Sequence, residues 1–201
     1  MKVLILDSST PLPFVAILED NTITFYKELK PQEQSSKHLL PLIEKEHLKT
    51  LGAIAIGRGP GSYTGIRIAL SIAKALSFAL NIPLIPFDAM KAIDTKKKGR
   101  FLIVLDARVA GFYGALCDNT NGLVNLTDPK VYTKEELLDE SVDFFVSLEP
   151  EKLKEKLPTE QGFFDKEHFK NLLSHAPIKA SDPFPLRYLG KVPVAFKADI
   201  M

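Results

Sequence analysis

Cysteine and excess charge are two features that this sequence has little of. Its 201 residues include one cysteine, Cys117, and the formal net charge at pH 7 is +1. A single cysteine excludes an internal disulfide framework and suits a reducing compartment, so we expect a cytoplasmic protein. A net charge this small gives no global field that would hold nucleic acid or an anionic membrane.

Signatures of catalysis and of metal binding are also missing. The four histidines contain no pair at the i, i+4 spacing that places two imidazoles on one helical face. The glycine-rich stretch 57–65 has neither the lysine of a P-loop nor the spacing of a dinucleotide fingerprint. Ser62 lacks the flanking glycines of a nucleophile elbow. We therefore expect no catalytic, cofactor-binding or metal-binding residues.

A glycine-rich turn is the most pronounced local feature that the sequence does have. A strand-like run, 51–56, leads into it, and a helix-like run, 66–80, leads out of it. Glycine enters positive φ at little steric cost, so the turn can follow a path that most residues could not. A serine or threonine in it can cap the helix by accepting a hydrogen bond from a backbone N–H. The structural residues expected in this turn are Gly59, Gly61, Ser62, Thr64 and Gly65.

The helix expected over 66–80 is apolar round most of its circumference. An ordinary surface helix has an apolar stripe a little over about 100° wide, so this helix must be covered on more than one side. One side can pack on its own sheet, and the other needs a second helix, a second subunit or a membrane. Charged residues in so short a run disfavour a membrane span, which takes about 20 apolar residues. The few polar residues are expected on one narrow stripe: Arg67, Ser71, Lys74 and Ser77.

The first half of the chain reads as a strand meander followed by helices. Strands are expected over 2–6, 14–18 and 22–29, joined tightly enough to be antiparallel. A helix is expected over about 35–48, and it either begins near Pro41 or is kinked there, because proline lacks an N–H. The charged, glycine-containing segment 94–100 is the expected boundary between domains 1–99 and 100–201. That segment reads as a solvated loop, with a phosphate-contacting patch as the alternative.

A second copy of one pattern begins after this boundary, because the strand–Asp–turn–strand pattern of 3–20 recurs at 101–118. Chance similarity between two buried hairpins is the alternative explanation. If the repeat is real, it indicates an α/β fold with two related lobes, the second reduced, of the actin-like superfold of sugar kinases and chaperone ATPases. The turns after Asp7 and Asp106 lack the glycines that a close approach to nucleotide phosphates requires, and Arg108 would project into such a site. ATP hydrolysis by this chain alone is therefore not expected.

Four sequence blocks resemble the TsaB family, which is the non-catalytic subunit of the bacterial tRNA threonylcarbamoyladenosine machinery. The blocks, dense over residues 1–115, are 6–10, 36–43, 59–67 and 106–108 with Tyr113 after them. The resemblance implies a reduced actin-like fold and a TsaD-like transferase as partner, with a TsaE-like ATPase docking on the pair. It also implies a homodimer when the chain is alone, contact with tRNA only through the complex, and no membrane.

The family's partner contact is a bundle made from the first two helices of each partner. On this sequence those helices lie around 39–43 and 66–80. The resemblance therefore implies a partner interface formed by Leu39, Leu42, Ile43, Ile66, Ala69, Leu70, Ala73 and Leu76.

Two departures and one rival reading accompany this resemblance. Gly111 stands where the family usually has an acidic residue, and the second lobe is short for the family. The rival reading is a stand-alone ATP-dependent kinase or carbamoyl-type transferase of the same superfold, in which Asp7 and Asp106 would hold the metal–nucleotide.

Overall fold

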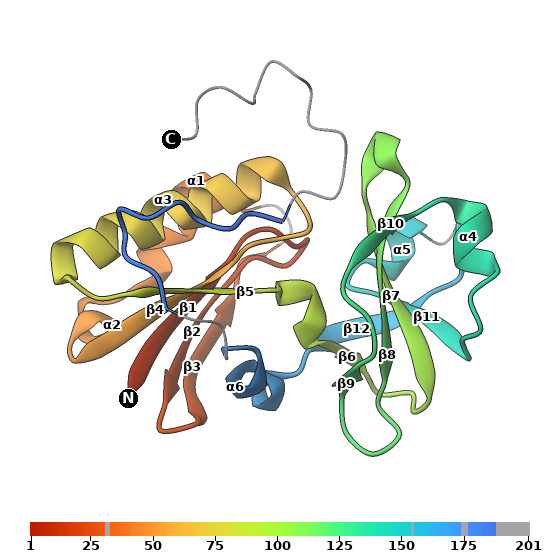
Figure 1. Cartoon of the computed structure of the whole chain (residues 1–201), viewed down its shortest axis with the longest axis horizontal. Coiled ribbons are helices and arrows are strands. Elements are labelled where there is room, and N and C mark those ends of the chain that lie inside the picture. Colours follow the sequence, from red (N-terminus) through yellow and green to blue (C-terminus); the bar gives the residue numbers. More distant parts are fainter. Residues whose placement is uncertain (31–32, 154, 174–176, 188–201) are drawn as a thin grey trace. The chain divides into compact units, whose positions relative to one another are not determined.

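The computed structural model contains two compact units, each built round one β-sheet (Figure 1). It describes residues 1–30, 33–153, 155–173 and 177–187. Unit 1 comprises Met1–Ala89 and Lys166–Leu186, and unit 2 comprises Met90–Asp165 and the segment that begins at Arg187. The division falls earlier than the charged segment 94–100, because residues 93–95 already pair within the second sheet. The return of 166–186 to unit 1 has no counterpart in the division expected from the sequence.

Unit 1 contains a five-stranded sheet in the order β3-β2-β1-β4-β5. Strands β1, β2 and β3 form the expected antiparallel meander, whereas β1, β4 and β5 run parallel. Asp20 and Asn21 close the β2–β3 turn with φ of 47° and 66°, as a two-residue hairpin of type I′ requires. The strands are β1 (Lys2–Asp7), β2 (Phe14–Glu19), β3 (Thr22–Glu28), β4 (Leu51–Gly57) and β5 (Leu84–Phe87).

One long helix, α3 (Tyr63–Leu80), covers this sheet, and the helix expected over 35–48 is broken into short pieces. The pieces are α1 (Ser35–His38), the 3-10 turn η1 (Leu40–Leu42) and α2 (Lys45–Leu48). Pro41 lies inside η1, where its missing N–H and its ring interrupt the helical hydrogen bonds. Their apolar side chains still pack against the core below α3.

After unit 2 the chain returns to unit 1, where α6 and the segment after it pack against the core of unit 1. Phe169 of α6 (Phe169–Leu172), which follows the 3-10 turn η4 (Lys166–His168), is fully buried with its ring centre 5.2 Å from that of Phe14. Residues 177–186, which we call the strap, then run beside α3 and β5 (Figure 1). Ile178 exchanges two backbone hydrogen bonds with Leu84 on the outer edge of β5, both 2.8 Å long.

Unit 2 repeats the strand order of unit 1. Its path runs β10-β8-β7-β11-β12-β6, with β9 added beside β8. The first five strands match β3-β2-β1-β4-β5 in order and in relative direction. Asp106 pairs with Phe112 as Asp7 pairs with Phe14. The strands are β6 (Ile93–Thr95), β7 (Arg100–Asp106), β8 (Phe112–Asp118), β9 (Val124–Asn125), β10 (Lys130–Tyr132), β11 (Phe144–Ser147) and β12 (Glu160–Phe164).

Short helices and 3-10 turns connect these strands. Thr133 and Glu136 form a reciprocal capping box at the start of α4 (Lys134–Leu138), as their spacing predicts. The other connecting elements are η2 (Ala89–Ala92), η3 (Arg108–Ala110) and α5 (Pro150–Leu153).

Among the residues that the structure describes, helix α3 is the one helix whose length and composition would also allow it to cross a membrane. The core helix of a globular protein passes the same test, so packing has to separate the two uses. The residues of α3 that face the sheet are buried, and they make up 28% of the helix. The described residues of the chain therefore leave the outer side of this helix uncovered.

Candidate functional site

The glycine-rich turn lies directly against the turn between β1 and β2. The backbone amide of Ser62 donates to the carbonyl oxygen of Ser9 at 2.7 Å, and the Ser8 hydroxyl donates to the carbonyl oxygen of Gly65 at 2.6 Å. A Cβ atom on Gly61 would stand 2.0 Å from that Ser9 oxygen, and one on Gly65 would stand 1.7 Å from the Ser8 oxygen. Glycine is thus required here by close backbone approach.

The other residues expected in this turn have different roles. Gly59 has φ of 93°, which explains the glycine at that position. The Ser62 side chain caps α3 by accepting a hydrogen bond from the Gly65 amide at 3.1 Å. Thr64 is exposed within the first turn of the helix and is not the cap.

Asp7 is fully buried behind this turn, and both of its carboxylate oxygens are occupied. One oxygen accepts from the amide and hydroxyl of Ser9, and the other from the amide and hydroxyl of Thr10. Burial raises the pKa of the Asp7 carboxyl above its ordinary value, although these hydrogen bonds act in the opposite direction. A Cβ on Gly57 would stand 1.9 Å from the carboxylate. The carboxylate therefore holds the turn together and faces no open space.

The corresponding turn of unit 2 is also closed by local contacts. The Asp106 carboxylate accepts a hydrogen bond from the Arg108 amide at 2.6 Å, and its other oxygen lies 3.7 Å from Lys156 Nζ. Arg108 itself has φ of 58°, a conformation that few residues other than glycine adopt. Gly111 has φ of 100°, and a Cβ atom there would stand 2.4 Å from the Tyr132 carbonyl oxygen, so the position has no room for a side chain.

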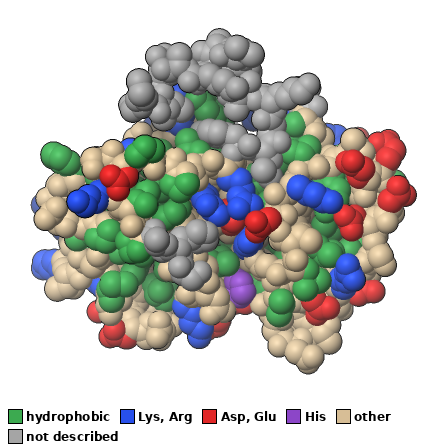
Figure 2. Space-filling model, in the orientation of Figure 1, with side chains coloured by type: hydrophobic (Ala, Val, Ile, Leu, Met, Phe, Trp, Pro, Cys, Tyr) green, Lys and Arg blue, Asp and Glu red, His purple; other side chains and the backbone are tan. Residues whose placement is uncertain are grey.

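The outer side of α3 and the neighbouring turn η1 expose large apolar side chains. Phe78 is 84% exposed and Leu80 is 39% exposed, and Leu40 of η1 is 52% exposed. Hydrophobic side chains gather over the part of unit 1 where α3 and the strap lie (Figure 2). We define the outer face of α3 as its five exposed residues at helical spacing: Thr64, Arg67, Ser71, Ala75 and Phe78.

The eight residues expected at the partner interface divide into two groups. Four are fully buried within the core of unit 1 and offer no surface to a partner: Leu39, Ile66, Ala69 and Ala73. Four are partly buried and pack against that core: Leu42, Ile43, Leu70 and Leu76. Ser77, expected on the polar stripe, is also buried, and its hydroxyl donates to the Ile82 carbonyl. The surface that α3 offers is therefore rotated from the one expected.

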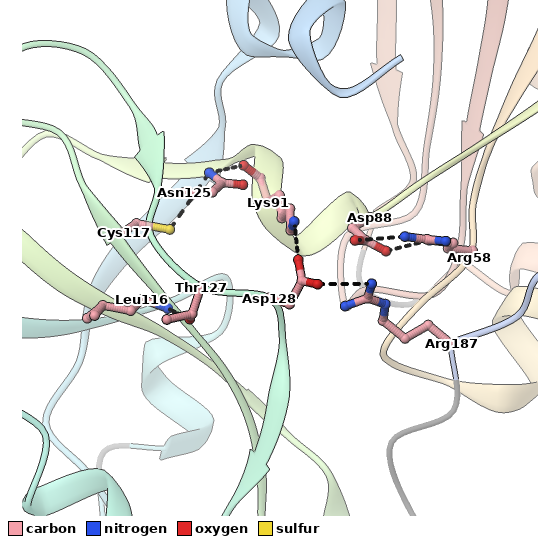
Figure 3. Close-up of polar contacts among 9 residues, drawn as sticks. All are labelled: Arg58, Asp88, Lys91, Leu116, Cys117, Asn125, Thr127, Asp128 and Arg187. Carbon is pink, nitrogen blue, oxygen red and sulfur yellow. Dashed lines mark hydrogen bonds and ion pairs between the residues drawn. The ribbon is translucent and has the colours of Figure 1, made fainter. Parts of the chain in front are cut away.

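Two polar clusters in the structure are not indicated by the sequence (Figure 3). In unit 1, Arg58 follows β4 and binds Asp88 after β5 through two hydrogen bonds of 2.7 and 3.2 Å, with Asp88 only 2% exposed. In unit 2, Asp128 lies 2.5 Å from Lys91 and 3.6 Å from Arg187. Each pair is far apart in the sequence, so no local pattern could have indicated it.

Two further features concern the single cysteine and the residue types that bind metals. Cys117 is buried in β8, and burial raises the pKa of its thiol to about 12, which keeps it protonated. Across the residues that the structure describes, no three histidine, cysteine or acidic side chains converge as metal ligands would.

Comparison with known proteins identifies a family model and relatives that this chain matches. The family model TsaD, tRNA N6-adenosine threonylcarbamoyltransferase, matches residues 32–162. The TsaB protein of Escherichia coli, named for tRNA threonylcarbamoyladenosine biosynthesis, is 30% identical over 70% of this chain and 65% of its own length. TsaB of Haemophilus influenzae is 33% identical over 56% of this chain and 52% of its own. The matched part thus spans less than two thirds of these relatives.

A solved structure shows the same fold over nearly the whole chain. YeaZ from Pseudomonas aeruginosa, which is a TsaB protein, superposes with a TM-score of 0.69 at 21% identity. The superposition covers 93% of this chain and 99% of that one. Together with the family match, these likenesses show that the chain belongs to the TsaB family, within the wider group that the TsaD model describes.

Proposed function

We propose that this chain is a non-catalytic docking subunit for a TsaD-like transferase in the biosynthesis of N6-threonylcarbamoyladenosine in tRNA. The observation that carries the proposal is the 84% exposure of Phe78 on a helix whose opposite side is buried in the core. An exposed aromatic residue on a packed helix is typical of a surface that another polypeptide covers. The names of the TsaB relatives supply the process, and the outer face of α3 supplies the surface.

The docking surface of this proposal is the outer face of α3 with Leu40 beside it. Ser71 and Ala75 are small residues one turn apart in its middle, so a second helix can approach the α3 backbone closely. Phe78 and Leu40 would then provide the apolar anchors. Leu42, Ile43, Leu70 and Leu76 stay in the proposal as the partly buried margin of this surface.

The non-catalytic part of the proposal rests on the β1–β2 turn. In an active member of the superfold this turn would contact nucleotide phosphates, yet here Ser62 and Gly65 of the chain itself take its hydrogen bonds. Asp7 has no acceptor capacity turned to an open space, because Ser9 and Thr10 use both of its oxygens. These contacts weigh against the rival reading of a stand-alone ATP-dependent kinase or transferase.

The finer description of the fold is part of the same proposal. The two sheets share one strand order, and each begins with a strand that ends in Asp and pairs with a strand that begins with Phe. This supports two related lobes of an actin-like ancestor, the second of them reduced. Within a cytoplasmic complex of this kind, we also propose a TsaE-like ATPase as a further partner, self-association when the chain is alone, and tRNA contact through the partners.

Size-exclusion chromatography with the TsaD-family protein of the same organism tests the docking role. The unmodified chain should co-elute with that protein, and Phe78→Ser should not, because the apolar anchor is removed. Val124→Ser is the matched control, since Val124 is 53% exposed but lies in unit 2. Co-elution of Phe78→Ser at the level of the control would overturn the docking face.

Calorimetry of the isolated chain with Mg-ATP tests the rival reading. The closed β1–β2 turn predicts no heat of binding at micromolar nucleotide. A micromolar dissociation constant that Asp7→Asn abolishes would favour the enzyme instead.

A further inference from the structure

The strap is held on unit 1 by few contacts. Beyond the two hydrogen bonds that Ile178 exchanges with Leu84, the side chains of Ile178 and Phe184 pack against the core while remaining partly exposed. Pro183 and Pro185 have no N–H, so they cannot extend the pairing along β5. A segment with so few backbone hydrogen bonds opens locally at a far lower free energy than the core does.

One contact of the strap uses a cation of α3. Lys74 Nζ donates to the backbone carbonyl oxygen of Asp182 at 3.3 Å. The Asp182 carboxylate points elsewhere and accepts from the Lys179 amide at 2.9 Å. Lys74 is therefore bound to a neutral acceptor at a long distance, although a carboxylate acceptor forms a hydrogen bond roughly twice as strong. The strap covers this flank of α3 and satisfies its ammonium group only weakly.

Arg67 lies on the same flank, two helical turns before Lys74. Seven residues advance an α-helix by about 10 Å and return to within about 20° of the same direction. Arg67 is exposed, with its guanidinium carbon 5.4 Å from the centre of the Tyr63 ring. Helix α3 contains no acidic residue, and neither cation has a carboxylate partner among the described residues. Two aligned cations thus lie along this side of α3, Arg67 within the outer face and Lys74 at its margin.

We propose that the helix that docks on α3 carries two carboxylate side chains seven residues apart, and that it displaces the strap to reach Lys74. This inference rests on the proposed docking role of α3. A second copy of α3 carries no acidic residue, so self-association through α3 would leave both cations without carboxylate partners, whereas an acidic helix of a different chain would pair them. The strap is then a displaceable cover that occupies Lys74 until the partner replaces the Asp182 carbonyl.

Titration calorimetry with the TsaD-family protein of the same organism tests this inference at low and at high salt. Arg67→Gln and Lys74→Gln should each weaken binding by about fivefold at low salt, and the loss should shrink at high salt. Lys27→Gln is the matched control, because Lys27 is exposed on β3 of the same unit. Ile178→Pro removes the N–H that binds Leu84, so it should strengthen binding by about threefold by freeing the flank.

Hydrogen exchange of the unmodified chain gives a second readout that does not depend on a variant folding. The Ile178 amide should be protected in the free chain and should lose its protection in the complex. Retained protection, or a strap variant that binds no better than the unmodified chain, would overturn the displacement of the strap. If Phe78→Ser abolishes binding while Arg67→Gln and Lys74→Gln match the control, the acidic partner helix is wrong and the docking face stands. Normal binding by Phe78→Ser would instead reject the docking face itself.

Discussion

The carbonyl oxygen of Ser9 occupies the space in which a Cβ atom of residue 61 would stand, 2.0 Å from that position. The same oxygen accepts the Ser62 amide, so a single atom of the β1–β2 turn fixes both the glycine and the start of α3. The β1–β2 turn therefore anchors the first turn of the helix.

Replacement of Gly65 by alanine is the cleanest test of this contact. Gly65 lies inside α3 with helical geometry, so alanine would be favoured there if space allowed. Its Cβ would stand 1.7 Å from the Ser8 carbonyl oxygen, and we expect Gly65→Ala to lower the free energy of unfolding by more than about 2 kcal/mol. Urea denaturation followed by circular dichroism measures the change.

Gly122→Ala is the matched control for that measurement. Gly122 has φ of 102° but nothing within 4 Å of a Cβ, so only backbone strain of about 1 kcal/mol should appear. Equal losses for the two variants would mean that the close approach to the β1–β2 turn has been misjudged.

Charge at position 73 should unfold the chain rather than merely separate it from a partner. Ala73 is fully buried against the sheet, so Ala73→Glu would bury an unpaired carboxylate and lower stability by more than about 3 kcal/mol. Phe78→Glu, five residues later on the exposed side, should change stability by less than about 0.5 kcal/mol. Thermal unfolding of the two variants distinguishes these faces, and a stable, monomeric Ala73→Glu chain would contradict the packing of α3.

The Asp7 carboxyl should make stability depend on pH in a direction opposite to that of an ordinary surface carboxylate. Burial raises its pKa in the folded state, so its contribution is complete below the unfolded value and is lost as pH rises through the folded value. Asp7→Asn cannot ionise. The free energy of unfolding of the unmodified chain, minus that of Asp7→Asn, should therefore increase as pH is lowered from neutrality towards about 4.

Asp20 provides the control of opposite sign. The N-terminal ammonium group of Met1 donates a hydrogen bond to the Asp20 carboxylate and lowers its pKa. The corresponding difference for Asp20→Asn should decrease over the same acidification. Urea titrations at several pH values test both, and a difference for Asp7→Asn that falls with acid would show that the hydrogen bonds to Asp7 outweigh its burial.

The contributions of Arg58 and Asp88 to the free energy of unfolding should be coupled. Arg58→Ala removes the guanidinium group that pairs with the buried Asp88 carboxylate, so it should lower the free energy of unfolding by about 3 kcal/mol. The double variant Arg58→Ala, Asp88→Ala should lose less than the sum of the two single changes. A double-mutant cycle by urea denaturation measures this coupling, and strict additivity would show that the two side chains act independently.

Features that depend on residues close together in the sequence could be predicted from the sequence. The structure confirms the serine cap expected in the glycine-rich turn, which Ser62 provides. The capping box at Thr133 and the Asp20–Asn21 hairpin likewise involve residues within a few positions of one another. Alternating and apolar runs likewise indicate the two strand pairs whose first strands end in Asp7 and Asp106.

Features set by contacts between distant residues could not be predicted in this way. The apolar pattern of α3 indicates that two sides need covering but not which residues face the sheet, and only the structure shows that Ala69 and Ala73 are buried against it. The return of 166–186 to unit 1 depends on Phe169 filling a gap beside Phe14. Nothing near residue 169 in the sequence indicates that gap.

Site-specific photo-crosslinking tests the central claim most directly. A photoreactive phenylalanine analogue in place of Phe78 keeps an aromatic ring within the proposed docking surface, and the same analogue in place of Leu138 serves as the control. Leu138 is 57% exposed but lies on α4 of unit 2. Irradiated with the TsaD-family protein of the same organism, the chain labelled at position 78 should form a covalent one-to-one product and the control should not. Absence of that product at position 78, or equal yield at both positions, would contradict docking through α3.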